Sequence, residues 1–146
     1  MSKPELNIAF VGNYSPRICG IATFTTDLCE ATATQLGQRS HVFTVAINDT
    51  DQGYAYPPQV EFAIQRNQQG DYYEAANFIN ASNADVACVQ HEYGIYGGWD
   101  GIYVLSLVSS LSVPACSLSS STRSFCAHRI VRDTGRRSRD AATSSR

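Results

Sequence analysis

Short apolar runs that end at a glycine or a polar residue recur along the first part of the chain. Residues 6–12, "LNIAFVG", are apolar at most positions, which is typical of a strand buried on both faces. From Ile21 the apolar positions recur at i, i+3, i+4, i+7 and i+8, the spacing of one helical face. This face runs to about Leu36, and Gly37 then ends the helix. The chain therefore begins with a strand, a glycine-containing turn and a helix.

The next apolar run indicates two further strands. Residues 41–47, "HVFTVAI", are rich in β-branched and aromatic side chains and predict the second strand. Residues 48–59 are polar, with glycine and proline, and predict a loop. Residues 60–64 then predict a short third strand.

A capping box marks the next helix. Asp71 stands three residues before Glu74 and ahead of an apolar face, which predicts a helix to about Ala81. Residues 85–90, "DVACVQ", predict another buried strand. A glycine-rich turn and a third helical face follow, and a further strand is expected from Val113. The residues of that face are Ile102, Leu105, Val108 and Leu111.

The order of these elements predicts the fold class. Strands that alternate with helices of ten to fifteen residues form right-handed βαβ units. We therefore expect an α/β domain with a doubly wound, mostly parallel, Rossmann-like sheet. Ligands of such sheets bind outside the carboxyl ends of the strands. Two segments fall at such ends: residues 17–28, "RICGIATFTTDL", and residues 89–101, "VQHEYGIYGGWDG".

Gly20 is the candidate binding residue of the first segment. The start of a helix exposes unpaired backbone N–H groups and a partial positive charge, which favour an anion. A glycine there lets a phosphate or a sugar approach those groups closely. The alternative is that Gly20 only lets the chain turn between strand and helix. Neither G-x-G-x-x-G nor G-x-x-x-x-G-K-[ST] is present, which argues against a nicotinamide enzyme or an ATPase.

The second segment places His91 and Glu92 directly after a buried strand. An imidazole and a carboxylate there can accept hydrogen bonds from sugar hydroxyls or move a proton. The alternatives are a solvated or capping carboxylate and a packed or surface histidine. Tyr93, Tyr96 and Trp99 can stack on a sugar ring, or can simply pack the loop.

Two longer stretches carry a resemblance to a known family. "IAFVGNYSPRICGIATFTTDLCEA" and "VACVQHEYGIYGGWDGIYVLSLVSSLSVP" together resemble the N-terminal domain of the family 4 (group 1) retaining glycosyltransferases, which have the GT-B fold. The likeness covers about residues 5–115 and is specific at 16–28 and 90–101. It implies two Rossmann-like domains that face each other across a cleft, the N-terminal one chiefly binding the acceptor.

The resemblance also implies roles for single residues. Gly20 looks like the glycine whose backbone approaches the phosphate and the transferred sugar of the donor. Ile21 and Ala22 would supply helix-start N–H groups beside it. Glu92 resembles the acidic residue that contacts the acceptor hydroxyl, with His91 as its neighbour, and Tyr93 is a candidate substrate contact. No cofactor and no metal are expected, and the implied donor is a nucleotide sugar from which a hexose is transferred with retention.

The resemblance further implies a C-terminal donor-binding domain, with an E-x7-E element, that the printed sequence does not contain. Because such enzymes divide the transition-state contacts between two domains, we expect no appreciable transferase activity from this chain alone. The expected partner is a sugar or glycan acceptor, with the nucleotide sugar bound only when a C-terminal domain is present. A rival from another class is a non-catalytic binding module for sugars that needs a separate partner domain.

Charge changes sign near Ser117. Before it stand four basic and eleven acidic residues, a net charge of −7, and from it onward stand seven basic and two acidic residues, a net charge of +5. We expect a family 4-like domain over residues 1–116, incomplete at its C-terminal side, and a Ser/Arg-rich tail over 117–146. Such a composition does not repay its ordering entropy by burial. The tail is either the product of a frameshift, the hypothesis we favour, or a genuine basic segment. Nucleic acid is an unexpected partner, because aromatic residues for stacking are scarce there.

Cysteine usage and hydropathy indicate the compartment. The five cysteines are odd in number, lack any C-x-x-C spacing and lie mostly in apolar runs, which favours a reducing, cytoplasmic setting. No apolar stretch approaches the roughly 18 residues of a membrane helix. We therefore expect a protein without a membrane span.

Overall fold

Five strands and three α-helices follow one another along residues 5–119, the part of the chain that the computed structural model describes, and a helix separates consecutive strands everywhere except between the second and the third. The strands are β1 (Ile8–Gly12), β2 (Val42–Asn48), β3 (Val60–Gln65), β4 (Val86–Gln90) and β5 (Ala115–Leu118). The helices are α1 (Gly20–Leu36), α2 (Gln69–Ala81) and α3 (Tyr103–Ser110), and a short 3₁₀ turn, Trp99–Gly101, precedes α3.

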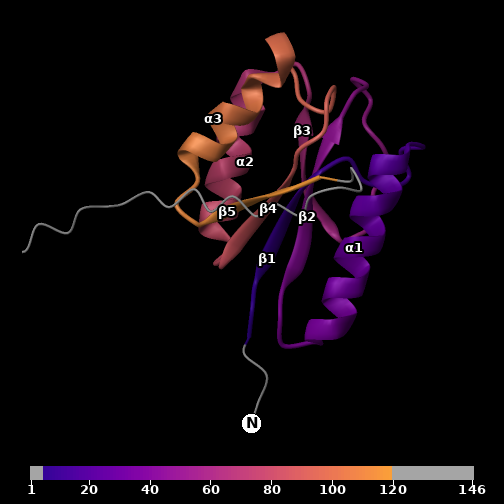
Figure 1. Ribbon diagram of the computed structural model, residues 1–146, viewed down its shortest axis with the longest axis vertical. Coiled ribbons are helices and arrows are strands. Elements are labelled where there is room, and N and C mark those ends of the chain that lie inside the picture. Colours follow the sequence, from indigo (N-terminus) through magenta and orange to yellow (C-terminus); the bar gives the residue numbers. More distant parts are fainter. Residues whose placement is uncertain (1–4, 120–146) are drawn as a thin grey trace, which may run out of the picture.

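The strands form one sheet in the order β3-β2-β1-β4-β5, and all four neighbouring pairs are parallel. Helix α1 covers one face of the sheet, and α2 and α3 lie side by side on the other (Figure 1). This is the α/β, doubly wound, Rossmann-like arrangement that the sequence predicts. The carboxyl ends of all five strands therefore meet at one edge.

Each face of the sheet has its own apolar core, because neighbouring residues of a strand point to opposite faces. Alternate residues of β1 and β4, such as Ala9, Val11, Ala87 and Val89, belong to the core under α2 and α3. The intervening residues, such as Ile8 and Phe10, belong to a smaller core under α1. All five residues of β1 and all seven of β2 are buried, which explains their continuous apolar runs.

The prediction of a capping box at the start of the second helix is wrong. Helix α2 begins at Gln69, and its N-cap Gln68 makes no hydrogen bond through its side chain. Asp71 instead accepts a hydrogen bond from the backbone N–H of Gln65, at 2.8 Å. The carboxylate thus closes the turn from β3 into the helix, a role that the spacing of acidic residues alone does not distinguish from a cap.

Strand β5 extends past Cys116, the last residue of the expected domain. Gln90 pairs with Leu118, and the N–H of His91 donates to the carbonyl of Leu118 at 2.6 Å. Ser117 and Leu118 are therefore part of the sheet. The rest of the expected tail, 120–146, lies outside the described residues.

Within residues 5–119, no helix has the length and apolar character needed to cross a membrane.

Candidate functional site at the carboxyl edge of the sheet

The two segments singled out in the sequence follow neighbouring strands in the middle of the sheet. The chain leaves β1 toward β2 on one side and leaves β4 toward β5 on the other. Their loops therefore diverge, which opens the crevice where doubly wound sheets bind ligands. Gly20 lies in the connection after β1, and His91 and Glu92 follow β4 directly.

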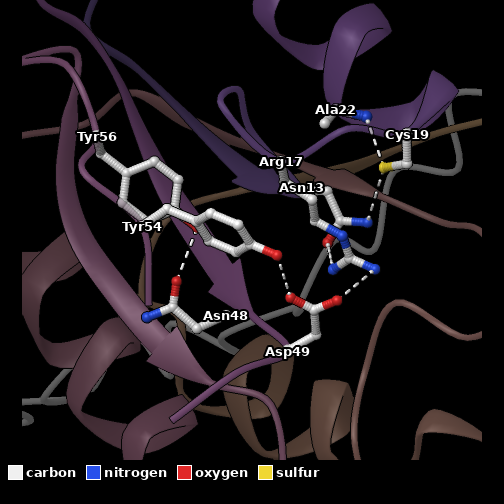
Figure 2. A network of polar contacts seen from close by, with 8 residues as sticks. All are labelled: Asn13, Arg17, Cys19, Ala22, Asn48, Asp49, Tyr54 and Tyr56. Carbon is white, nitrogen blue, oxygen red and sulfur yellow. Dashed lines mark hydrogen bonds and ion pairs between the residues drawn. The ribbon is translucent and has the colours of Figure 1, made fainter. Parts of the chain in front are cut away.

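A polar network joins the loops after β1 and β2, and sequence reasoning did not anticipate it. The Arg17 guanidinium donates to Asn13 Oδ1 at 3.0 Å, and it lies 3.2 Å from Asp49 Oδ2. The hydroxyl of Tyr54 donates to Asp49 Oδ1 at 2.7 Å, and that of Tyr56 donates to Asn48 Oδ1, also at 2.7 Å. Figure 2 shows the Arg17 guanidinium between the Asn13 amide and the Asp49 carboxylate.

The electrostatics of Asp49 follow from this network. Burial by itself would raise the pKa of Asp49, but the hydrogen bond from Tyr54 and the charge of Arg17 outweigh it, so the pKa is lowered. Asp49 is therefore held as a carboxylate and neutralises Arg17. The Arg17 guanidinium thus holds the loop after β1 in place, and the Asp49 carboxylate neutralises its positive charge.

The thiol of Cys19 caps the start of α1. Its Sγ accepts a hydrogen bond from the N–H of Ala22 at 3.3 Å and lies 3.8 Å from Asn13 Nδ2 (Figure 2). A thiol is a weak acceptor, so a ligand with phosphate or hydroxyl oxygens can compete for this N–H group. The backbone N–H group of the buried Ala22 is thus held by a weak hydrogen bond within the chain.

Gly20, the first residue of α1, is exposed and has open space around it. An added Cβ would meet nothing within 4 Å, and the φ angle of Gly20 lies outside the left-handed region. Gly12 is different, since its Cβ would stand 2.8 Å from Cβ of Gln90. Packing against the described residues therefore requires a glycine at position 12 but not at position 20.

Gln90 ends β4 with a side chain that is only 1 % exposed. Neither its Oε1 nor its Nε2 finds a hydrogen-bond partner among the described residues. A Cβ on Gly12 would also lie 3.6 Å from Thr25 Oγ1, so Gln90, Gly12 and the first turns of α1 meet at one place. A buried amide without partners costs free energy, so a water, an ion or a ligand beside it would be stabilising. In the sequence, the one sign that points to Gln90 is its position at the end of a strand. No pattern of residue types indicates that its amide is buried without partners.

His91 is exposed and Glu92 is half-buried, on the segment that follows β4. The hydroxyl of Ser119, just past β5, donates to Glu92 Oε1 at 3.2 Å. The Glu92 carboxylate is thereby oriented from the neighbouring strand end. Tyr93 projects from the same segment with 93 % of its surface exposed.

The glycine-rich loop after β4 is anchored by two tyrosines. The hydroxyl of Tyr72 accepts from the N–H of Gly97 at 2.9 Å and donates to the carbonyl of Arg66 at 2.8 Å. The hydroxyl of Tyr96 donates to the carbonyl of Gln90 at 2.5 Å. Burial raises the pKa of both phenols, so they remain protonated donors at neutral pH. Of the three aromatic residues weighed for stacking, Tyr96 is buried as loop packing, whereas Tyr93 and Trp99 are exposed.

A separate cavity lies at the opposite, amino edge of the sheet. It has a volume of about 520 Å³ and is lined by residues that include Gly37, Gln59 and the pair His41 and Glu61. The Nε2 atom of His41 lies 2.6 Å from Glu61 Oε1. None of the residues expected to bind substrate lines this cavity, so we place the candidate site at the carboxyl edge on the positions of Gly20, Gln90 and Glu92.

The described residues contain no group of three or more His, Cys, Asp or Glu side chains placed to hold a metal ion. No family model, curated protein or solved structure matches the chain. A proposal about function therefore rests on the geometry of the carboxyl edge and on the residues that lie there.

Proposed function

We propose that this chain is the acceptor-side domain of a retaining glycosyltransferase of the family 4 type. In this proposal it binds a sugar or glycan acceptor, to which a hexose is transferred from a nucleotide sugar held by a donor-binding domain. The observation that carries the proposal is the open space around Gly20 at the start of α1.

Glycine is a poor helix former, less favourable than alanine by about 1 kcal/mol in a helix interior, so helix propensity does not account for Gly20 as the first residue of α1. Neither a left-handed φ nor a close neighbour among the described residues requires it. This argues against the alternative that Gly20 only permits a turn. Close approach of a ligand to the first N–H groups of α1 accounts for it, since a methyl group would hold a phosphate or a sugar away.

Gln90 is a second, independent reason to place a ligand there. Its carboxamide has two donor hydrogens and an acceptor oxygen, as sugar hydroxyls require, and these atoms have no partner among the described residues. A ligand that reached the amide would convert an unfavourable buried group into a favourable contact.

The roles of the other residues follow from their positions. Glu92, oriented by Ser119, accepts a hydrogen bond from an acceptor hydroxyl, and the exposed His91 stands beside it. Ile21 and Ala22 supply N–H groups at the start of α1, where the Cys19 thiol is displaced from Ala22. Tyr93 offers an exposed ring for stacking on a sugar face. In transfer with retention, the N–H groups stabilise charge that develops on the leaving phosphate.

Amide chemical shifts of the ¹⁵N-labelled full chain test the proposal, with hexose monosaccharides as probes. We expect shifts confined to residues 20–22 and 90–93, and weaker binding by Gly20→Ala. Gly70→Ala is the matched control, because Gly70 is also a helical glycine with open space but lies in α2. Shifts around the cavity at Gly37 and Glu61, or equal binding by Gly20→Ala and the wild type, would refute the proposal.

A stand-alone binding module is the second candidate function. The exposure of Ile18 and Trp99 at the carboxyl edge favours it, because apolar side chains beside a binding site suit contact with a second domain. Mixing the chain with a separately expressed donor-binding domain separates the candidates. Sugar binding without turnover, alone and in the mixture, supports the module, whereas turnover in the mixture supports the transferase.

A further inference from the structure

Cys88 of β4 and Cys116 of β5 lie side by side in the sheet. They are paired in register on adjacent parallel strands, and their sulfur atoms are 3.1 Å apart. Neighbouring strands are about 4.8 Å apart, which falls within the Cα–Cα range of disulfides. The sulfur atoms therefore need to approach by only about 1 Å to reach bonding distance.

An oxidant can reach this pair. Cys88 and Cys116 are both half-buried, on the face of the sheet that carries α1. Helix α1 packs against β1 and β2, so it leaves this part of the face less covered. Of the other described cysteines, Cys29 is fully buried and Cys19 caps α1, and neither forms a hydrogen bond with another thiol.

We propose that Cys88 and Cys116 are a redox-active dithiol that forms a reversible disulfide between β4 and β5 on exposure to a peroxide. The contact between the two sulfur atoms carries this inference, which is independent of the proposed function.

One thiol of the pair is activated by the other. The hydrogen bond with Cys88 lowers the pKa of Cys116 to about 7, and the same hydrogen bond together with burial raises the pKa of Cys88. In the neutral pair the S–H of Cys116 donates to Cys88 Sγ. When Cys116 loses its proton, the S–H of Cys88 can donate to the thiolate instead, which favours that form of Cys116. The thiolate is the form of cysteine that reacts with peroxides.

The reaction proceeds in two displacements. The Cys116 thiolate attacks one oxygen of hydrogen peroxide, the O–O bond breaks, and the departing hydroxide takes up a proton to become water. The sulfur of Cys88 then attacks the resulting sulfenic acid of Cys116, the S–O bond breaks, and hydroxide leaves with the Cys88 proton as a second water. The two thiols lose two electrons in total, and these reduce the peroxide.

The disulfide would fasten β5, an edge strand of the described sheet, to its neighbour β4. β5 contributes the carbonyl of Leu118 to the N–H of His91, and Ser119, just past β5, donates through its hydroxyl to Glu92. The Cys88–Cys116 cross-link would lie two residues before the last pair of the two strands, Gln90 and Leu118. It would therefore hold the strand ends, and the contacts beyond them, together. Oxidation should therefore slow proteolysis of the chain near β5.

Peptide mapping of the oxidised full-length protein tests the proposal. Combined digestion with trypsin and an Asp-specific protease separates Cys88, in residues 85–99, from Cys116, in residues 100–123, and both from Cys126. After treatment of the folded protein with hydrogen peroxide, we expect these two peptides to be linked. A reductant should release them. Cys88→Ala and Cys116→Ala should each abolish the link, and the matched control Cys29→Ala should retain it.

Wild-type protein oxidised in concentrated guanidinium provides a control that needs no variant. If the fold directs the pairing, unfolding should make it unselective among the five cysteines. The proposal is overturned if the folded protein yields unlinked Cys88 and Cys116 peptides. It is equally overturned if these cysteines pair with Cys19, Cys29 or Cys126 as often as with each other.

Discussion

Arg17 and Asp49 form an ion pair of 3.2 Å between the loop after β1 and the loop after β2. Their side chains are 18 % and 27 % exposed, so solvent screens the pair only in part. The pair fixes the loop that leads into α1 and hence the position of Gly20. It links the stability of the carboxyl edge to the geometry of the proposed site.

Removing the charge of Asp49 should destabilise the protein in a pH-dependent way. The pKa of Asp49 is lower in the folded state than in the unfolded one, so its contribution is complete above about pH 4 and is lost as the pH falls through the folded-state value. We expect Asp49→Asn to lower the free energy of unfolding by about 1 kcal/mol at pH 7, with a smaller difference near pH 3. Urea unfolding of both proteins at the two pH values measures this. An equal difference at both pH values would assign the effect to packing.

Gly97→Ala should strongly destabilise the loop after β4. An added Cβ would stand 1.9 Å from the carbonyl oxygen of Arg66, and backbone at that place cannot move aside cheaply. The expected loss is about 3 kcal/mol in the free energy of unfolding, the upper end of overpacking effects. Thermal unfolding of Gly97→Ala beside Gly70→Ala, where a Cβ meets open space, provides the comparison. Equal melting temperatures would contradict the close contact.

Tyr72→Phe should cost more than Tyr54→Phe. The hydroxyl of Tyr72 links Arg66 to Gly97, so its loss leaves a half-buried carbonyl and a buried N–H group without this partner. We expect about 2 kcal/mol of destabilisation for Tyr72→Phe. Tyr54 donates to Asp49 at the surface, where water can replace the contact, so its loss should cost less. Chemical denaturation ranks the two variants, and the reverse order would show that the Tyr72 contact is not structural.

Gln90→Leu should separate stability from binding. The buried amide has no partner among the described residues, so an apolar side chain of similar volume should leave the free energy of unfolding unchanged or raise it by about 1 kcal/mol. Ligand binding at the carboxyl edge should be lost at the same time. Urea unfolding and ¹⁵N shift titration of the same sample measure both quantities. Marked destabilisation would mean that the amide is structural.

The order of elements was predictable because it rests on local information. The buried runs of β1 and β2, the helical period from Ile21 and the glycine at position 37 each act within a few residues, and the observed elements start and end within about two residues of their expected positions. Asp71 was misjudged because a carboxylate three residues before a glutamate also suits a turn, and Gln65, its partner, belongs to the preceding strand. Local spacing cannot distinguish the two.

The candidate site was predictable only in part. The sequence indicated Gly20 because it stands at the start of the helix after the first strand, and His91 and Glu92 because they directly follow an apolar run. Such positions gather at one edge of a parallel sheet. The roles of Arg17, Asp49 and Gln90 depend on which strands become neighbours. Strand order arises from contacts between residues far apart in the chain, so the Arg17–Asp49 pair and the meeting of Cys88 with Cys116 became visible only in three dimensions. Hydrophobic periodicity determines whether a segment forms a strand or a helix. Long-range packing determines which polar groups meet, because no local pattern encodes the order of the strands.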